Sequence, residues 1–461
     1  MSFFRKILMN LPEVEGPTQK RLSFKEKLKW TGIVLVTFFI LGLIPLFGLG
    51  RNSLEQFEFL SVILGAEFGS IISLGIGPIV TASIVLQLLN GSGIIKFDLN
   101  SDEGKKTFQG VQKLLAIFFI FFESIIYVFM GGLAPAESLT GTVAYFNLEV
   151  LIIFQMFLGG IAILFMDEIV SKWGFGSGVS LFIAAGISKA LFITTLSPLQ
   201  SPQNPEFATG ALPVLLQSLS SGSSQLALLQ VAGIAATIAV FVIAVYSQAM
   251  KVEIPLSFGR VRGHGVRWPL AFIYTSNIPV ILVAALLANI QLWARLLSNW
   301  LNVDAQSVVS WVTVPGGQEG LLGLIIRQGS LLIGWKPYAQ GLIYMLIMIV
   351  GCIIFSWFWV QTTGMDARSQ AKKIISSGLQ MPGFRKDERV LEKVLNRYIQ
   401  PLNVMGAITI GFLAALADMA GALVSGTGLL LTVMIVYKLY EEIAKQHMYD
   451  MHPMMRKFMD V

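Results

Sequence analysis

The sequence has little of what catalytic and metal-binding proteins need. It holds one cysteine, Cys352, and three histidines, His264, His447 and His452, among 461 residues. No intramolecular disulfide is therefore possible, and no Cys/His cluster, HExxH motif or GxxxxGK[ST] loop occurs that would hold zinc or a nucleotide phosphate. A GxSxG elbow and a pair of aspartates inside spans are also absent. These absences predict a protein that is not an enzyme and that uses neither a metal nor a cofactor.

Charged residues are scarce as well, at 13% against 54% hydrophobic residues, which is outside the range of soluble domains. Ten apolar stretches approach the roughly 20 residues that are needed to cross the hydrocarbon core of a membrane. They lie at residues 30–48, 70–89, 111–131, 147–168, 178–195, 226–249, 270–290, 338–362, 402–418 and 421–440. The sequence therefore predicts an all-α polytopic membrane protein with ten transmembrane helices.

The ten spans divide into two halves of five. The N-terminal half covers residues 30–195 and the C-terminal half covers residues 226–440. Between them lies an external linker, residues 196–225, rich in Ser, Pro, Gln and Gly. Two pseudo-symmetric halves around a central path are a common way to build a membrane transport protein.

Basic residues predict which side of the membrane each end faces. About 27 of the 33 Lys and Arg residues fall in the two terminal segments and in the loops on the same side, and such loops are cytoplasmic. The N-terminal segment, residues 1–29, starts an amphipathic helix at a capping box of Ser23 and Glu26. The tail covers residues 441–461. We therefore expect a multi-pass protein of the cell membrane with both termini in the cytoplasm.

Two long cytoplasmic loops, residues 250–269 and 363–400, carry clustered basic residues. Such loops can be topology signals with some lipid headgroup contact, or a docking surface for an anionic partner such as RNA. Their length favours a docking surface, since orientation alone does not require so many residues.

Helix-weakening residues interrupt the second span. Gly75, Gly77 and Pro78 lie at its start, and the apolar segment just before it, within residues 51–69, is too short to cross the membrane. We expect that segment to be buried, re-entrant or interfacial. Glu123 is the one acidic residue deep in a span, either satisfied by its neighbours or part of a polar seam between helices. A small-molecule secondary transporter is the competing interpretation, and the scarcity of midplane charge disfavours it.

Five motifs follow one another in a recognisable order. They are LGIGPIVTASIVLQLL at 74–89, GSGVSLFIAAGI at 176–187, SNIPVIL at 276–282, PGFR at 382–385 and SGTGLLL at 425–431. Together they resemble the SecY family, the channel subunits of the protein-secretion translocase, and the loop at 256–270 resembles its archaeal and eukaryotic branch. The resemblance implies a passive protein-conducting channel that moves unfolded polypeptides across the membrane and releases hydrophobic helices laterally into it.

The resemblance also implies two closing devices. A ring of aliphatic side chains narrows an hourglass-shaped pore, and the matching residues are Ile76, Val80, Ile183, Ile187, Ile281 and Leu431. A plug blocks the outer funnel at residues 54–69, with marked positions at Phe57, Leu60, Leu64, Gly65 and Gly69.

A lateral gate is implied where the second and third spans meet the seventh and eighth, with a polar cluster of Thr81, Glu123 and Asn277. Ribosome contact is implied for three loop arginines, Arg260, Arg262 and Arg385. The implied partners are a SecE-like subunit, a SecG-like or beta-type subunit, ribosomal RNA of the ribosome or another cytosolic motor, signal sequences, nascent polypeptides and membrane lipids.

Overall fold

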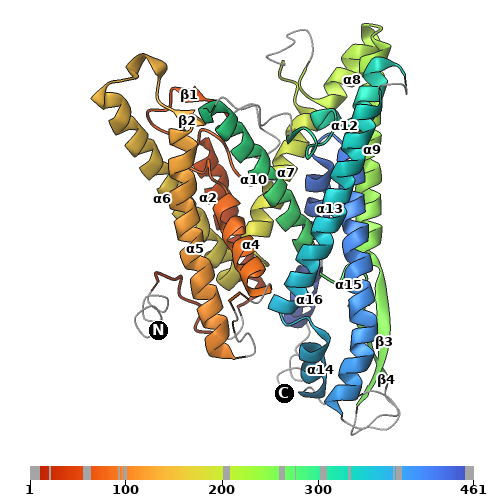
Figure 1. Ribbon diagram of the computed structural model, residues 1–461. Coiled ribbons are helices and arrows are strands. Elements are labelled where there is room, and N and C mark those ends of the chain that lie inside the picture. Colours follow the sequence, from red (N-terminus) through yellow and green to blue (C-terminus); the bar gives the residue numbers. More distant parts are fainter. Residues whose placement is uncertain are drawn as a thin grey trace.

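The computed structural model confirms a mostly helical membrane protein (Figure 1). It describes residues 11–19, 22–54, 64–91, 94–95, 97, 101–200, 208–258, 265–275, 277–301, 309–330, 334–376, 379–380 and 387–451. A helix lies at each of the ten predicted spans: α2 (Phe24–Leu43), α4 (Gly77–Gly91), α5 (Asp102–Phe129), α6 (Val143–Trp173), α7 (Gly178–Leu196), α9 (Ser224–Ala249), α10 (Ile278–Leu301), α13 (Trp335–Thr362), α15 (Glu388–Met419) and α16 (Gly426–Met451). Within the described ranges, six helices are long and apolar enough to cross a membrane by length and composition.

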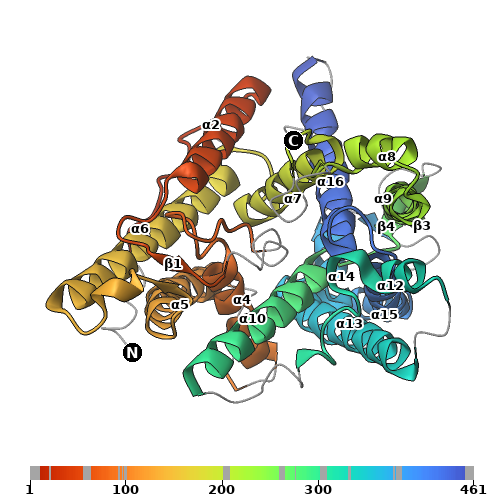
Figure 2. The same ribbon diagram turned by 90° about the horizontal axis from the view of Figure 1, so that it is seen from above.

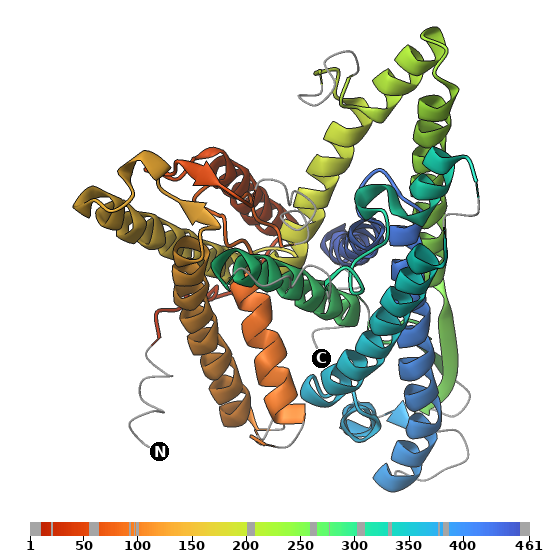
Figure 3. The ribbon, with the colours of Figure 1, turned by 45° about the horizontal axis from the view of Figure 1, so that its top comes forward.

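The helices form two groups that meet along a seam. Seen from above, α2, α4, α5, α6 and α7 lie on one side, and α9, α13, α15 and α16 lie on the other (Figure 2). Helix α10 runs along the border (Figure 3) and packs against α4 of the first group and α13 of the second. The fold therefore brings the second and seventh predicted spans together, although nearly 200 residues separate them in the chain.

The second span starts later than its hydrophobicity predicts. Ser70 forms an isolated bridge with Pro45, residues 71–76 form turns, and α4 begins at Gly77 rather than at residue 70. Gly75 has a φ of +56°, which a residue with a side chain rarely adopts, so the chain cannot be helical there. Pro78 occupies the first turn of α4, where its missing N–H costs no helical hydrogen bond.

The connecting segments contain short helices that hydrophobic length did not predict. Helix α8 lies within the predicted linker, and α12 lies between the seventh and eighth spans. Their bounds are η2 (Glu137–Leu139), α8 (Ala211–Ser220), η3 (Gly317–Glu319), α12 (Gly320–Gln328) and α14 (Ala367–Ser376).

In the part of the chain that the structure describes, five strands in two sheets add to the expected helices. Strands β1 (Arg51–Asn52) and β2 (Leu133–Ala134) pair antiparallel, and the second sheet has the order β4-β3-β5, with β3 (Lys251–Phe258), β4 (Gly265–Ala271) and β5 (Leu379–Gln380). The physical reason for β3 is its alternation, because Val252 and Ile254 point to one face while Lys251 and Glu253 point to the other. Ser257 pairs with Gln380, so the second sheet joins the two predicted basic loops.

Candidate functional site

Six aliphatic side chains expected to form a ring come from four helices and both halves. Ile76 immediately precedes α4 and Val80 lies in its first turn, while Ile183 and Ile187 lie on α7, Ile281 on α10 and Leu431 on α16. All six belong to one buried hydrophobic cluster and are between 0% and 6% exposed. The structure therefore buries all six side chains between the two groups of helices.

Helices α7 and α16 meet at close range beside these residues. A Cβ atom built at Gly428 would lie 3.0 Å from Cδ1 of Ile187. Phe182, the residue before Ile183, stacks on Phe38 of α2 with ring centroids 4.7 Å apart. The backbone of α16 thus packs closely on Ile187, and the aromatic packing of α2 fixes the residue next to Ile183.

The end of the predicted plug contacts the ring. Phe57 and Leu60 lie outside the described residues, and the described part, residues 64–69, forms turns rather than the expected end of a short helix. The backbone N–H of Ile76 donates a 2.8 Å hydrogen bond to the carbonyl oxygen of Leu64. The side chain of Leu64 packs with Ala288 of α10. This segment therefore bridges the N-terminal half and the C-terminal half.

Gly65 and Gly69 both adopt positive φ angles, at +53° and +96°. The N–H of Gly69 donates to the hydroxyl of Ser73 at 2.9 Å. The side-chain amide of Asn52 donates to the carbonyl of Phe68 at 3.1 Å. These hydrogen bonds satisfy backbone groups where the chain turns back into the apolar interior, as a re-entrant segment requires.

A polar contact crosses the seam between the two halves. The side-chain amide of Asn289 on α10 donates a 3.0 Å hydrogen bond to the hydroxyl of Thr81 on α4. The carboxylate of Glu123 on α5 lies against Thr81 and is 1% exposed. An apolar contact accompanies it, since the rings of Phe122 and Trp293 are 5.9 Å apart.

Sequence reasoning chose Asn277 for this cluster and missed Asn289. Asn277 immediately precedes α10, and twelve residues of helical rise separate it from Asn289 by about 18 Å. Asn289 is therefore the residue of this helix whose side chain is bonded to Thr81. A polar residue in the middle of the apolar stretch VAALLANIQL was the available signal.

The seam is incompletely satisfied. Among the residues that the structure describes, Oε2 of Glu123, Oε1 of Gln87 and Oδ1 of Asn289 are buried and have no hydrogen-bond partner. A buried polar atom without a partner costs free energy relative to one that is paired. Unpaired polar atoms of this kind lower the stability of the packed seam.

A second candidate surface lies beside the two basic loops. Arg260, Arg262 and Arg385 fall outside the described residues, while the pairing of Ser257 with Gln380 brings the bases of their loops together.

A basic groove on α15, missed by sequence reasoning, adds to this surface. Its exposed cations, Arg389, Lys393 and Arg397, lie four residues apart on one helix face, and no carboxylate lines it. The four-residue spacing of these cations was the signal. The groove can accept an anionic partner.

The N-terminal segment is attached to the end of α6. The indole N–H of Trp173 donates to the carbonyl of Glu15 at 2.9 Å, and Lys172 forms an ion pair with Glu13. The hydrogen bond and charge of Lys172 hold the pKa of Glu13 below its usual value, although partial burial opposes this shift. The segment thereby covers one end of the α5 and α6 pair.

Comparisons with known proteins agree with this geometry. The SecY family matches residues 70–440, and the plug domain of Sec61p matches residues 36–69. The chain is 43% identical to the protein translocase subunit SecY of Methanothermobacter thermautotrophicus, over 99% of this chain and 98% of that one.

Two solved structures are also similar. The structure of a protein-conducting channel has a TM-score of 0.80 at 41% identity and covers 97% of this chain and 98% of that one. Sec61 in the canine ribosome-channel complex from the endoplasmic reticulum has a TM-score of 0.77 at 40% identity, with the same coverage.

The two family matches together cover residues 36–440, which include the ring residues, the plug segment and the seam. Each alignment covers nearly the whole of this chain and nearly the whole of the relative. This multi-pass membrane protein, a protein-conducting channel subunit rather than an enzyme, belongs to the SecY family.

Proposed function

We propose that this chain conducts unfolded polypeptides through a pore between its two halves, at the ring formed by Ile76, Val80, Ile183, Ile187, Ile281 and Leu431. The observation that carries this proposal is the burial of these side chains, from both halves, in one hydrophobic cluster, with the end of the plug segment hydrogen-bonded to Ile76. Polypeptides of any sequence can pass such a ring, because branched aliphatic side chains yield without specific binding.

The ring serves a second purpose in the resting state. An aliphatic constriction excludes ions by dewetting, so that no charged group is needed to repel them. The hydrogen bond from Ile76 to Leu64 ties the ring to the plug segment. Displacement of the plug and widening of the ring are therefore coupled steps of opening.

The seam between α4 and α5 on one side and α10 and α13 on the other is the lateral gate. A hydrogen bond across a helix seam in lipid contributes only about 0.6 to 2 kcal/mol, and Asn289 supplies one to Thr81. A hydrophobic signal helix inserted there replaces polar contacts with apolar ones. A partner that binds the open seam better than the closed one shifts such a balanced equilibrium.

The driving partner is the ribosome, docked at the cytoplasmic surface. The basic loops joined by the β3 and β5 pairing, with Arg260, Arg262 and Arg385, face RNA phosphates together with the basic groove on α15. The excess of basic residues on this side supports cytoplasmic locations for both termini. The canine relative at 40% identity comes from a ribosome-channel complex, which supports the same partner.

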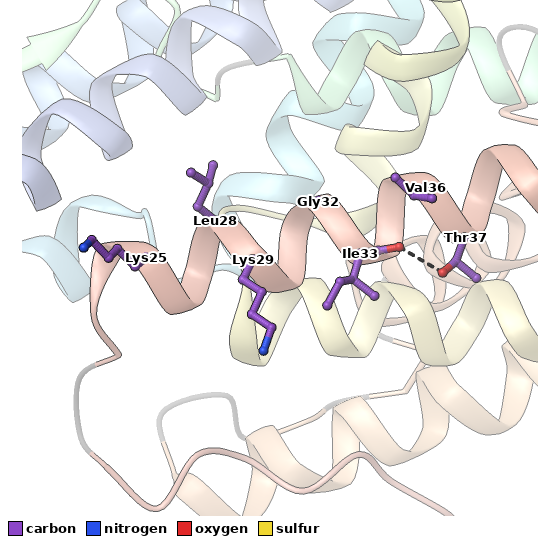
Figure 4. A pocket seen from close by; sticks show the side chains of 7 residues that line it. All are labelled: Lys25, Leu28, Lys29, Gly32, Ile33, Val36 and Thr37. Atoms are coloured by element: carbon purple, nitrogen blue, oxygen red, sulfur yellow. Dashed lines mark hydrogen bonds between the residues drawn. The ribbon is translucent and has the colours of Figure 1, made fainter.

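Small single-span subunits complete the channel at its outer helix faces. Figure 4 shows a shallow groove along α2 that is lined by Lys25, Leu28, Lys29, Gly32, Ile33, Val36 and Thr37. Gly32 leaves room for a close helix-to-helix approach, and the neighbouring apolar residues are exposed. This face suits a SecE-like or beta-type helix, with the two lysines meeting its acidic residues or lipid phosphates.

Site-specific crosslinking to a stalled nascent chain tests the pore. A photoreactive residue replaces Ile187 or Ile281, and a ribosome-bound chain with a signal sequence is halted midway. Crosslinks from both positions that disappear when the signal is deleted are expected. A lipid-facing control at Phe241 of α9, which is 52% exposed, should give none. No crosslinks from a folded, ribosome-binding complex would contradict the pore assignment.

A further inference from the structure

A carboxylate of one helix holds the start of the next helix at the end of the N-terminal half. Oδ1 of Asp167 on α6 accepts a 2.9 Å hydrogen bond from the backbone N–H of Val179, the second residue of α7. The side chain of Ser177, the residue that precedes α7, makes no capping hydrogen bond of its own. The first turn of α7 is thus capped from the preceding span instead of locally.

The end of the C-terminal half repeats the carboxylate contact, although here Oγ of Ser425 also caps α16 locally, by accepting a 3.0 Å hydrogen bond from the backbone N–H of Gly428. Oδ1 of Asp418 on α15 accepts a 2.8 Å hydrogen bond from the backbone N–H of Thr427, the second residue of α16. The other oxygen, Oδ2, accepts hydrogen bonds from the hydroxyl of Thr427 and, at 2.7 Å, from that of Tyr344 on α13. Asp418 is 5% exposed, so these contacts replace water.

At both junctions the start of the helix lies very close to the helix that precedes it. Each helix begins with a glycine, Gly178 or Gly426. A Cβ atom at Gly178 would lie 2.5 Å from Cα of Asp167, and one at Gly426 would lie 2.0 Å from the carbonyl carbon of Ala417. Any side chain would push the helix away from the carboxylate. Glycine and aspartate therefore act together to fix where each helix starts.

The capped helices carry the ring. Ile183 follows Val179 by four residues, and Leu431 follows Thr427 by four residues. Four residues correspond to about 6 Å of rise and slightly more than one turn, so each side chain projects from nearly the same face as its capped N–H. The two carboxylates thus stand in the same relation to a ring side chain in both halves.

We propose that Asp167 and Asp418 are paired positioning residues that set the register of Ile183 and Leu431 in the closed pore. The N–H of Thr427 is buried and that of Val179 is partly buried, so a helix that slips or unwinds by one residue loses its carboxylate acceptor with limited access to water in exchange. The positive end of the helix dipole strengthens the attraction. This inference rests on the proposed ring function.

Disulfide trapping in the full-length chain tests the register. The native cysteine is first replaced, as Cys352→Ala, and a pair is introduced as Ile187→Cys with Gly428→Cys. A Cβ at 428 lies 3.4 Å from Cγ1 of Ile187, so the two positions are neighbours in the closed structure. The same Cβ lies 2.4 Å from Oγ of Ser425, so this side chain must rotate to admit the cysteine, and every variant is compared with the cysteine pair in the otherwise native chain. Asp167→Ala and Asp418→Ala should each slow oxidation of the pair by about fivefold, the factor expected for a lost helix cap.

Ion leak through the resting channel in reconstituted vesicles is the second readout, with the ring left native. Asp167→Ala and Asp418→Ala should raise it by about fivefold. The rescue variants Asp167→Asn and Asp418→Asn keep an oxygen acceptor and should restore both readouts. The matched control Tyr344→Phe removes one contact to Oδ2 and leaves the cap of Thr427 intact, so its leak should stay native. Asp418→Glu, which moves the acceptor by one methylene, should leak even where the alanine variant does not fold.

Outcomes separate this inference from the ring assignment. Folded alanine variants with native trapping and native leak, in vesicles where Ile183→Gly leaks, would overturn the positioning role and leave the ring standing. Where Ile183→Gly does not leak, the ring assignment fails, and the trapping rate alone decides whether the carboxylates set the register. An equal ion leak through the Asp418→Asn and Asp418→Glu channels would also overturn the proposal.

Discussion

Asn289 and Thr81 join the two halves of the channel through a 3.0 Å hydrogen bond between α10 and α4. The two residues are more than 200 positions apart in the chain. In the described part of the structure, two buried oxygen atoms beside this bond, Oε2 of Glu123 and Oδ1 of Asn289, have no hydrogen-bond partner. This hydrogen bond therefore links the two sides of a seam where other buried polar atoms are unpaired.

Asn289→Ala should make the gate less stringent. The substitution removes one closed-state hydrogen bond worth about 0.6 to 2 kcal/mol, so weakly hydrophobic signal sequences should be exported several-fold better. Export of a reporter with graded signal hydrophobicity measures the threshold. The control Ser83→Ala breaks a 2.6 Å bond to Gln112 that stays within the N-terminal half, and it should leave the threshold unchanged. Equal thresholds in the Asn289 variant and the native chain would refute the seam assignment.

Ring substitutions should make the resting channel conduct ions. Replacing Ile183 and Ile187 by serine makes the constriction wettable, and single-channel recording in lipid bilayers should show resting conductance at least about tenfold above native. The exposed Ile193 of α7 supplies the control, since Ile193→Ser lies outside the buried cluster and should not leak. Native conductance in a folded double variant would mean that these residues do not line the barrier.

Gly75→Ala should loosen the plug. Its Cβ would lie 2.2 Å from the carbonyl oxygen of Leu64, and the φ of +56° is strained for alanine by about 1 to 3 kcal/mol. We expect increased resting leak with translocation retained. Gly131→Ala is the matched control, because Gly131 also has positive φ but no atom within 4 Å of its Cβ position. A leak in both variants would point to backbone strain alone, and a leak in neither would count against the plug contact.

The basic groove on α15 should contribute to ribosome binding. Arg389→Gln, Lys393→Gln and Arg397→Gln should each weaken binding and lower the slope of log affinity against log salt by about one, as expected for a lost phosphate contact. Sedimentation with purified ribosomes at several salt concentrations measures this slope. Arg327→Gln is the control, since Arg327 pairs with Glu319 on the predicted external side. An unchanged slope in all three groove variants would exclude this surface.

Acid should release the N-terminal segment from α6. The pKa of Glu13 is lowered in the folded protein by Lys172, so this contact stabilises the folded state fully above pH 4.5 and is lost as pH falls through the lowered value. The effect is small because the Glu13 side chain is 66% exposed. Hydrogen exchange at the Val14 amide, which donates to Glu168, should report the release after correction for intrinsic rates. Lys172→Met should show reduced protection already at neutral pH; constant protection from pH 7 to below the lowered pKa would argue against the contact.

Much of the fold was predictable because hydrophobic length is a local property. Each apolar stretch of about 20 residues must be helical, since lipid offers no other partner for backbone groups. The short segment before the second span was recognisable for the same reason. Motifs such as LGIGPIVTASIVLQLL then indicated which helices carry ring residues.

The remaining features depend on which helix faces meet, and hydrophobic length carries no such information. Asn289 rather than Asn277 reaches Thr81 because of the level at which α10 crosses α4. Asp167 precedes Gly178 by 11 residues, whereas Asp418 precedes Gly426 by 8 residues. The two equivalent caps therefore share no sequence motif from which they could be predicted.

The sequence by itself determined the number, order and orientation preference of the spans, because burial in lipid acts on each segment separately. Only the tertiary structure decided where each helix starts, which polar groups cross the seam and how the ring is held. Those features arise from contacts between segments far apart in the chain, and their geometry exists only once the helices have packed.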